Sequence, residues 1–214
     1  KNEVDFIDAM HHLDVDALKS VIAKGYNVSD YERGNGSALI KTMYDCSNVI
    51  LSIFKKYWPE KYENYYYDVL PITDKATLPE VVKKEVEQAI QLLISVMDIL
   101  YQNGADINKC GMRIADDTLM GVLLANYKVV NTSSPFCSVI NLLNHFQSSE
   151  LVTWFIGKNG FDLNSEKNAI SNLLKYDSKI STEVLNLLLM NGLKIEDYEV
   201  VQAIENKEQA THSK

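Results

Sequence analysis

Apolar residues recur at three- and four-residue steps along most of the chain, the spacing that puts them on one face of an α-helix. The longest stripe follows Pro79 and consists of Val82, Val86, Ala89, Leu93, Val96 and Leu100. From Ala89 onward the segment is apolar on nearly every side, as expected of a central helix covered by its neighbours. Helices are predicted over residues 3–11, 14–24, 37–57, 79–102, 115–129, 138–158 with a break near 147, 167–176, 182–191 and 197–205. The pattern therefore predicts an all-α fold.

Polar residues at the predicted helix starts agree with these boundaries. Ser37 stands where an N-cap hydroxyl would accept hydrogen bonds from the first free backbone amides. Acidic pairs fall at helix starts, where carboxylates complement the helix dipole. These pairs are Glu3/Asp5, Asp14/Asp16 and Asp116/Asp117. We interpret these carboxylates as helix caps and not as a general acid and base.

Four predicted helices close in the same way, on a glycine with an apolar residue four places before it and, in three of the four, another seven places before it. The four glycines are Gly25, Gly104, Gly160 and Gly192. A left-handed cap costs a residue with a side chain roughly 1–2 kcal/mol, and glycine avoids this cost. After each glycine an aliphatic residue stands between polar residues, in the triplets 27–29, 106–108, 162–164 and 194–196. A recurring helix end and turn is the sequence signature of a repeat protein.

The sequence GADIN at residues 104–108 resembles the ending of the second helix in the ankyrin-repeat family. That family opens its next repeat with T-P-L-H about twelve residues after the glycine. This chain has SALI at 37–40 and DTLM at 117–120, and both blocks lack the family's Pro and His. The four glycines are 79, 56 and 32 residues apart, and only the last spacing is close to a standard repeat of about 33 residues.

The resemblance implies a short solenoid of about four irregular ankyrin-like repeats. We expect one repeat domain over residues 1–205, enlarged by insertions at about 46–85 and 130–148. Residues 206–214 are polar and are expected to form a C-terminal tail.

The net charge of −8 argues against some classes of partner. A protein that grips phosphates usually carries a basic face, and the basic residues here form no cluster beyond pairs such as Lys83 and Lys84. We therefore expect neither nucleic acid nor a membrane as a partner. Solubility and recognition of a basic partner both remain as explanations of the acidity. The apolar segment 89–101 is too short to span a bilayer.

The cysteines and histidines indicate no catalytic or metal site. The cysteines are odd in number and widely spaced, which suits a reducing compartment; they are Cys46, Cys110 and Cys137. The histidines show no metal-binding spacing; they are His11, His12, His145 and His212. We predict no cofactor and no metal.

The N-terminus bears on localisation. The chain does not begin with Met, which is expected if the chain is trimmed, and residues 1–5 lack a signal-peptide hydrophobic block. We expect a cytoplasmic protein, or one in a host cytosol if it is a secreted effector.

Members of the ankyrin family bind protein partners through their turns and first helices, so the resemblance implies a protein-binding function without catalysis. Carried over by position, the candidates are Tyr31, Glu32, Arg33 and Asn35 in the first turn region, and Lys109, Met112 and Arg113 in the second.

The tyrosine-rich stretch 56–68 adds Tyr62, Tyr65, Tyr66 and Tyr67. Tyrosine is enriched at interface hot spots, but rings that pack on their own scaffold are an equally good interpretation.

Two alternative functions remain open. One is a bacterial or viral inhibitor or immunity-type factor that neutralises a toxin or a defence protein. The other is an enzyme whose insertions build a pocket, with Cys137 and His145 as the reactive pair. The sequence leaves the identity of the partner and the oligomeric state open.

Overall fold

A computed structural model describes residues 2–64, 75–109, 112–113, 129–130, 138–166, 169–170, 173, 180–196 and 205. Its helices are α1 (Asn2–His11), α2 (Val15–Ala23), α3 (Val28–Asn35), α4 (Ala38–Tyr57), α5 (Pro59–Tyr62), the 3₁₀ helix η1 (Lys75–Thr77), α6 (Glu80–Gln102), α8 (Val139–Phe146), α9 (Ser149–Ile156) and α11 (Thr182–Met190). Two short strands, β1 (Met112–Arg113) and β2 (Val129–Val130), pair antiparallel. Apart from this pair, the regular elements of the described part are helical, and the fold is all-α.

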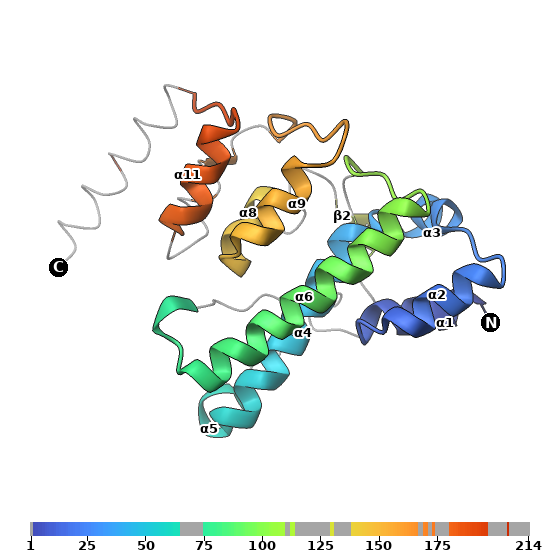
Figure 1. Cartoon of the computed structure of the whole chain (residues 1–214), viewed down its shortest axis with the longest axis horizontal. Helices are drawn as coiled ribbons and strands as arrows, with labels where there is room; N and C mark the ends of the chain where they lie inside the picture. Colours follow the sequence, from blue (N-terminus) through green and yellow to red (C-terminus); the bar gives the residue numbers. More distant parts are fainter. Residues whose placement is uncertain are drawn as a thin grey trace.

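The helices pack in two layers (Figure 1). Helices α2, α6, α9 and α11 form one layer, in which each helix contacts the next. Helices α1, α4 and α8 lie behind them, and each packs against the helix that follows it in the first layer: α2, α6 and α9. The chain therefore builds a row of helix pairs that lie side by side.

The long pair α4 and α6 forms the centre of the molecule (Figure 1). The apolar stripe predicted after Pro79 is buried along its whole length, so this prediction is confirmed. On the facing helix Phe54 is fully buried, and the Cys46 thiol donates to the carbonyl oxygen of Ala89 at 3.6 Å. Burial raises the pKa of the Cys46 thiol, which keeps it protonated and unreactive.

Serine hydroxyls fix the starts of four helices. Ser37, Ser138, Ser148 and Ser181 each accept a hydrogen bond from the backbone N–H three residues later. This bond satisfies one of the free amides at a helix start, and it confirms the N-cap predicted at Ser37. The Asp14 carboxylate caps α2 in the same way.

Three of the four predicted glycine caps are confirmed. Gly25, Gly104 and Gly192 have φ angles of 97°, 101° and 99°. The residue after each glycine donates its N–H to the carbonyl five residues earlier, at 3.3, 2.9 and 3.0 Å, which is the hydrogen bond of a Schellman cap. The cap predicted at Gly160 is wrong: α9 ends at Ile156 with Gly157 as its C-cap, and Gly160 lies in the turn that follows.

Other segments also differ from the prediction or lie outside the described residues. Helix α3 was not predicted, and Val129 belongs to a strand and not to the end of a helix. The helix predicted at 138–158 with a break near 147 is confirmed, because α8 ends at Phe146 and α9 begins at Ser149. Helix α8 lies inside the predicted insertion 130–148 and packs on α9. The tail 206–214 and most of the helices predicted at 115–129, 167–176 and 197–205 lie outside the described residues.

Hydrogen bonds join each glycine turn to the next, and we call this set of bonds the turn spine. Asn108 donates from Nδ2 to the Gly160 carbonyl at 2.6 Å and accepts at Oδ1 from the Asp162 N–H at 2.9 Å. Asn164 makes the same two bonds one unit later, to the Gly192 carbonyl at 2.9 Å and from the Lys194 N–H at 2.8 Å. The two asparagines therefore occupy equivalent places in successive units.

At the first junction the backbone N–H of the second turn bonds to Glu32, which lies on α3. Its Oε1 accepts from the Asp106 N–H at 2.8 Å, two residues after Gly104, just as Asp162 and Lys194 follow their glycines by two. Its Oε2 accepts from the Ala38 N–H at 2.9 Å, at the start of α4. The side chain is only 5% exposed, so a buried carboxylate joins α3, α4 and the second turn.

An ion cluster on the buried Asp45 joins α1 to α4. Its Oδ1 accepts from Lys41 Nζ at 2.5 Å and from His11 Nδ1 at 3.3 Å. The hydrogen bond to Asp45 is the main cause that raises the pKa of His11 above its usual value. A raised folded-state pKa contributes stability below the unfolded pKa, and this stability is lost as pH rises through the folded pKa.

We therefore expect His11→Gln to lower the melting temperature more at about pH 5.5 than at about pH 8.5. The effect should stay below about 1 kcal/mol, because the imidazole is half exposed and water screens the pair. Thermal denaturation at the two pH values measures it. His12→Gln is the control, because His12 bonds to the backbone carbonyl of Asp8 and not to a carboxylate. An equal loss at both pH values would contradict the ion pair.

Candidate binding groove

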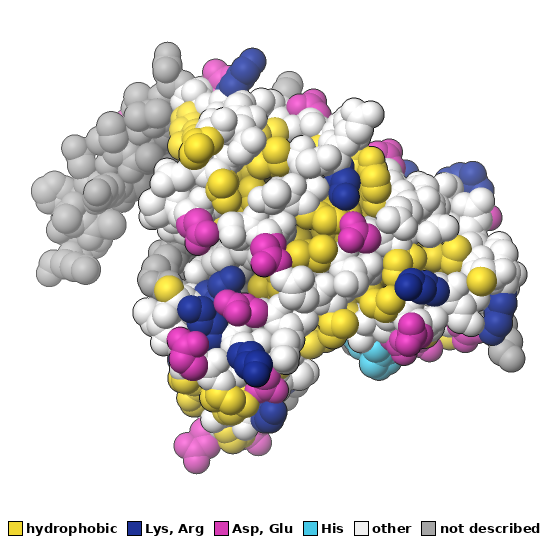
Figure 2. Space-filling view, in the orientation of Figure 1, with side chains coloured by type: hydrophobic (Ala, Val, Ile, Leu, Met, Phe, Trp, Pro, Cys, Tyr) yellow, Lys and Arg dark blue, Asp and Glu magenta, His cyan; other side chains and the backbone are white. Residues whose placement is uncertain are grey.

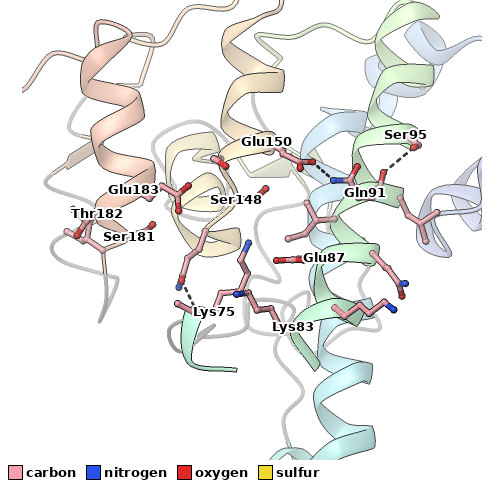
Figure 3. Close-up of a pocket in the computed structure, with 18 residues that line it drawn as sticks. Lys75, Lys83, Glu87, Gln91, Ser95, Ser148, Glu150, Ser181, Thr182 and Glu183 are labelled. Atoms are coloured by element: carbon pink, nitrogen blue, oxygen red, sulfur yellow. Dashed lines mark hydrogen bonds between the residues drawn. The ribbon is translucent and has the colours of Figure 1, made fainter. Parts of the chain in front are cut away.

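A groove of about 1120 Å³ lies between α6, η1 and the N-terminal ends of α9 and α11 (Figure 3). We call it the α6–α11 groove. The helices that border it carry their glycine turns at their opposite, C-terminal ends. The groove therefore lies at the end of the helices that is opposite to the turn spine.

One wall is the polar face of α6. Lys83, Glu87 and Gln91 follow each other at four-residue steps, so their side chains lie on one face of the helix. The apolar stripe of the same helix is buried in the core. The amphipathic pattern of α6 therefore directs these charged and amide groups to the groove.

The other wall is formed by the first turns of α9 and α11. Asn144 on α8 accepts at Oδ1 from the Ser181 N–H at 2.7 Å and so fixes the start of α11. Glu150 and Glu183 lie in the first turns of α9 and α11, as expected near the positive end of a helix dipole. Gln91 donates from Nε2 to Glu150, which links the two walls (Figure 3).

Lys75 on η1 closes the groove at one side. Its backbone N–H donates to Gln147 Oε1 at 3.0 Å, and Gln147 has a left-handed backbone (φ 49°) in the turn between α8 and α9. The Lys75 side chain is half-buried, and burial lowers its pKa. Within the part of the chain that the structure describes, its amine makes no hydrogen bond and no ion pair.

The groove carries charges of both signs. The basic residues are Lys75, Lys83 and Lys84, and the acidic ones are Glu87, Glu150 and Glu183. Among the described residues no salt bridge joins these two groups. Figure 2 shows basic and acidic side chains close together on this face of the molecule. A ligand that brings charges of both signs would therefore match the groove.

A second hollow of about 400 Å³ shares Gln91 and Glu150 with the groove and extends it along α6 and α9. At its far end the Lys158 amine lies 4.6 Å from the centre of the Trp154 ring and 5.2 Å from that of Tyr101. The Trp154 indole donates to the Asp98 carboxylate at 2.6 Å. These contacts give the extension a fixed aromatic end.

The residues predicted in the first turn region form α3, and two of them are core residues. Tyr31 and Glu32 are 3% and 5% exposed, and the Tyr31 ring packs on Phe6 at 5.1 Å. Because they offer no free surface, we correct their interpretation from partner-binding to structural. Arg33 is exposed and pairs with Asp30, and Asn35 donates to the Tyr31 carbonyl at 3.0 Å.

The tyrosine-rich stretch is core at the position that can be described. Tyr62 is 5% exposed and packs on Phe54 at 5.4 Å and on Trp58 at 6.4 Å. Of the two interpretations left open for this stretch, Tyr62 therefore fits the one in which its ring packs on its own scaffold. Tyr65, Tyr66 and Tyr67 lie outside the described residues.

The second turn region lies beside the first. Lys109 is half-buried and acts electrostatically on Glu32, whereas Met112 and Arg113 form β1, which lies against α4. None of the predicted binding residues is among those that line the described groove.

Other candidate chemistry is confined to a few groups. His145 is buried, and burial lowers its pKa to about 4, so the imidazole is neutral at pH 7. Cys137, its suggested partner, lies outside the described residues. In the described ranges no group of His, Cys, Asp and Glu is arranged to hold a metal ion. Also within those ranges, no helix has the length and apolar character needed to cross a bilayer.

Sequence reasoning missed the groove because its walls come from distant segments. The four-residue spacing of Lys83, Glu87 and Gln91 marked a polar helix face, which is common on any surface helix. Nothing in the pattern placed Lys75 or Glu183 opposite that face. In comparisons with known proteins, no family model, no curated protein and no solved structure matches the chain.

Proposed function

We propose that the chain is a protein-binding module, an ankyrin-like repeat stack that docks a segment of a partner protein in the α6–α11 groove. Either outcome of such binding, occlusion of the partner's own site or scaffolding of the partner, is compatible with this function. A factor that neutralises a toxin or a defence protein would be one example of the occluding form.

The turn spine supports the repeat interpretation. Asn108 and Asn164 make identical bonds to successive turns, and at the first junction the Glu32 carboxylate accepts from the backbone N–H of the second turn. Equivalent bonds at equivalent positions are expected when similar helix pairs are stacked in a row. Such stacks present extended surfaces to their partners, and most known uses of these surfaces are in recognition.

The groove itself is the observation that carries the binding proposal. Its volume of about 1120 Å³ exceeds the range of about 300–1,000 Å³ that is typical of small-molecule sites. Its charges lie on rigid helices and lack ion-pair partners among the described residues. A polypeptide segment supplies both the size and the mixed charges that such a surface requires.

Charge reversal in the groove tests this function. The chain is immobilised, a partner is captured from cell extract and identified by mass spectrometry, and its affinity is measured with purified components. We expect Glu183→Lys to weaken binding at least about tenfold, because it reverses a charge that the partner must match.

Asp16→Lys is the matched control, because Asp16 is also an exposed acid in the first turn of a helix, α2. It should bind the partner as wild type does. If both variants keep their melting temperature and bind equally well, the partner docks elsewhere and the groove proposal is wrong.

A further inference from the structure

We propose that the bound segment places an acidic side chain on the Lys75 ammonium group and a lysine or arginine beside Glu87 and Glu183. This inference rests on the proposed function, because it names the chemistry of the partner at the same groove. It identifies an ampholytic segment, with an Asp or Glu next to a basic residue, as the recognised element.

Among the charged groups of the groove, the Lys75 ammonium group is the one that a partner's charge would stabilise most. Its side chain is half-buried, and its amine makes no hydrogen bond or ion pair in the described part of the chain. A charge removed from water without a partner is unfavourable. A carboxylate delivered by a partner would give this half-buried ammonium group a charge-assisted hydrogen bond, which is stronger than a bond between neutral groups. Burial also lowers the pKa of Lys75, which agrees with its incomplete solvation.

The backbone around Lys75 is held in place, so the ammonium group is presented from a fixed base. The Lys75 N–H bonds to the Gln147 side chain at 3.0 Å, and η1 leads directly into α6. Figure 3 shows Lys75 and Lys83 at the same end of the groove, with Glu87, Glu150 and Glu183 around the rest of it. A segment lying in the groove would therefore meet basic and acidic groups in turn.

The acidic residues of the groove argue against a bound segment that carries only acidic side chains. Glu87 and Glu183 both act electrostatically on Lys75, yet neither forms a salt bridge with it. They would repel a segment that carried only carboxylates, as would the net charge of −8 on the whole chain. A basic residue next to the incoming carboxylate removes this repulsion. Because Glu87 and Glu183 are exposed, simple loss of either charge should change the affinity less than loss of the Lys75 charge. Reversal of such a charge has a larger effect, because it also adds repulsion between like charges.

Apolar groups in the groove give the segment a further contact. Ile90 lies at the base of the groove and Ile180 is half-buried in the opposite wall. Leu92 lines the groove one helical turn after Gln88, and it is 46% exposed. An apolar residue in the bound segment would cover this leucine.

Selection from a random peptide display library tests the inference. The library is selected on wild-type chain, and enriched sequences are made as synthetic peptides with acetylated N-termini and amidated C-termini, so that only side chains carry charge. We expect the enriched peptides to share an acidic residue next to a basic one. Lys75→Met should weaken their binding at least about tenfold, and Lys75→Glu should select peptides with a basic residue in place of the acidic one.

Lys19→Met is the control variant, because Lys19 is an exposed lysine on α2, outside the groove. It should leave peptide binding unchanged. Lys75→Met should not lower the melting temperature, because the amine has no partner in the free chain. A lower melting temperature would assign Lys75 a structural role and overturn the inference.

The remaining outcomes separate the two proposals. Peptides that are sensitive to Glu183→Lys but lack an acidic residue, or that bind Lys75→Met normally, overturn the Lys75 pairing and leave the groove as a docking site. If no peptide is enriched, or if none is sensitive to a groove variant, the pairing and the proposed function both fall.

Discussion

Replacement of Glu32 by alanine should lower the free energy of unfolding by about 2–5 kcal/mol. The carboxylate accepts hydrogen bonds from the N–H groups of Asp106 and Ala38, and it is only 5% exposed. Alanine would leave the buried Ala38 amide and the part-buried Asp106 amide without an acceptor, and each unsatisfied buried donor costs about 1–3 kcal/mol. Denaturant unfolding measures the loss.

Two further variants make this result specific. Glu32→Gln keeps one oxygen acceptor but turns an amide group toward the second N–H. It should therefore lower the free energy of unfolding measurably, but by less than Glu32→Ala does. Glu60→Ala removes an exposed carboxylate from the first turn of α5 and should change stability by less than about 0.5 kcal/mol. If Glu32→Ala is no less stable than Glu60→Ala, the buried carboxylate does not hold the first junction of the turn spine.

Substitution of Gly104 by valine should cost about 1–3 kcal/mol. The φ angle of 101° is one that β-branched residues rarely adopt, and an added Cβ would lie 3.3 Å from Ser29 Oγ at the start of α3. Strain in the cap and close contact with α3 therefore act together. Chemical denaturation of the purified variant gives the size of the effect.

Gly25 and Gly34 provide matched comparisons. Gly25 has a similar φ of 97° but no atom within 4 Å of an added Cβ, so Gly25→Val should show the cap strain alone. Gly34 lies inside α3 with open space around it, and Gly34→Ala should be neutral or slightly stabilising because alanine favours helix. A Gly104 variant as stable as the Gly34 variant would show that the predicted turn register is wrong.

The helices could be predicted where apolar spacing was regular. The stripe from Val82 to Leu100 fixed the extent of α6 to within a residue at its start, and Gly104 marked the turn beyond its end. Helix α3 was missed because residues 28–35 contain few apolar positions, and its buried Glu32 has the appearance of a surface charge. A carboxylate can be buried there because two backbone amides compensate it, and these amides come from segments that the local pattern does not connect.

The groove could not be predicted for a related reason. It depends on the N-terminal end of α11 lying opposite the middle of α6, and periodicity within one helix does not say which helix lies beside another. Tyr62 shows the same limit: the tyrosine-rich composition of its segment left interface and core open, and in the structure the ring packs on Phe54 and Trp58. Local composition identifies side chains that are able to bind, and tertiary packing decides which remain free.

The opposite placement of the turn spine and the groove has a consequence for how this protein can diversify. The glycines of the first two turns are separated by 79 residues and those of the last two by 32, yet in both cases a side-chain oxygen of the earlier unit accepts from the N–H two residues after the later glycine. Residues added between α4 and α6 enter at the groove end, and each doubling of a loop costs only about 0.6 kcal/mol of closure entropy. Evolution, or a protein engineer, can therefore lengthen or change the groove end while the architecture at the other end stays the same.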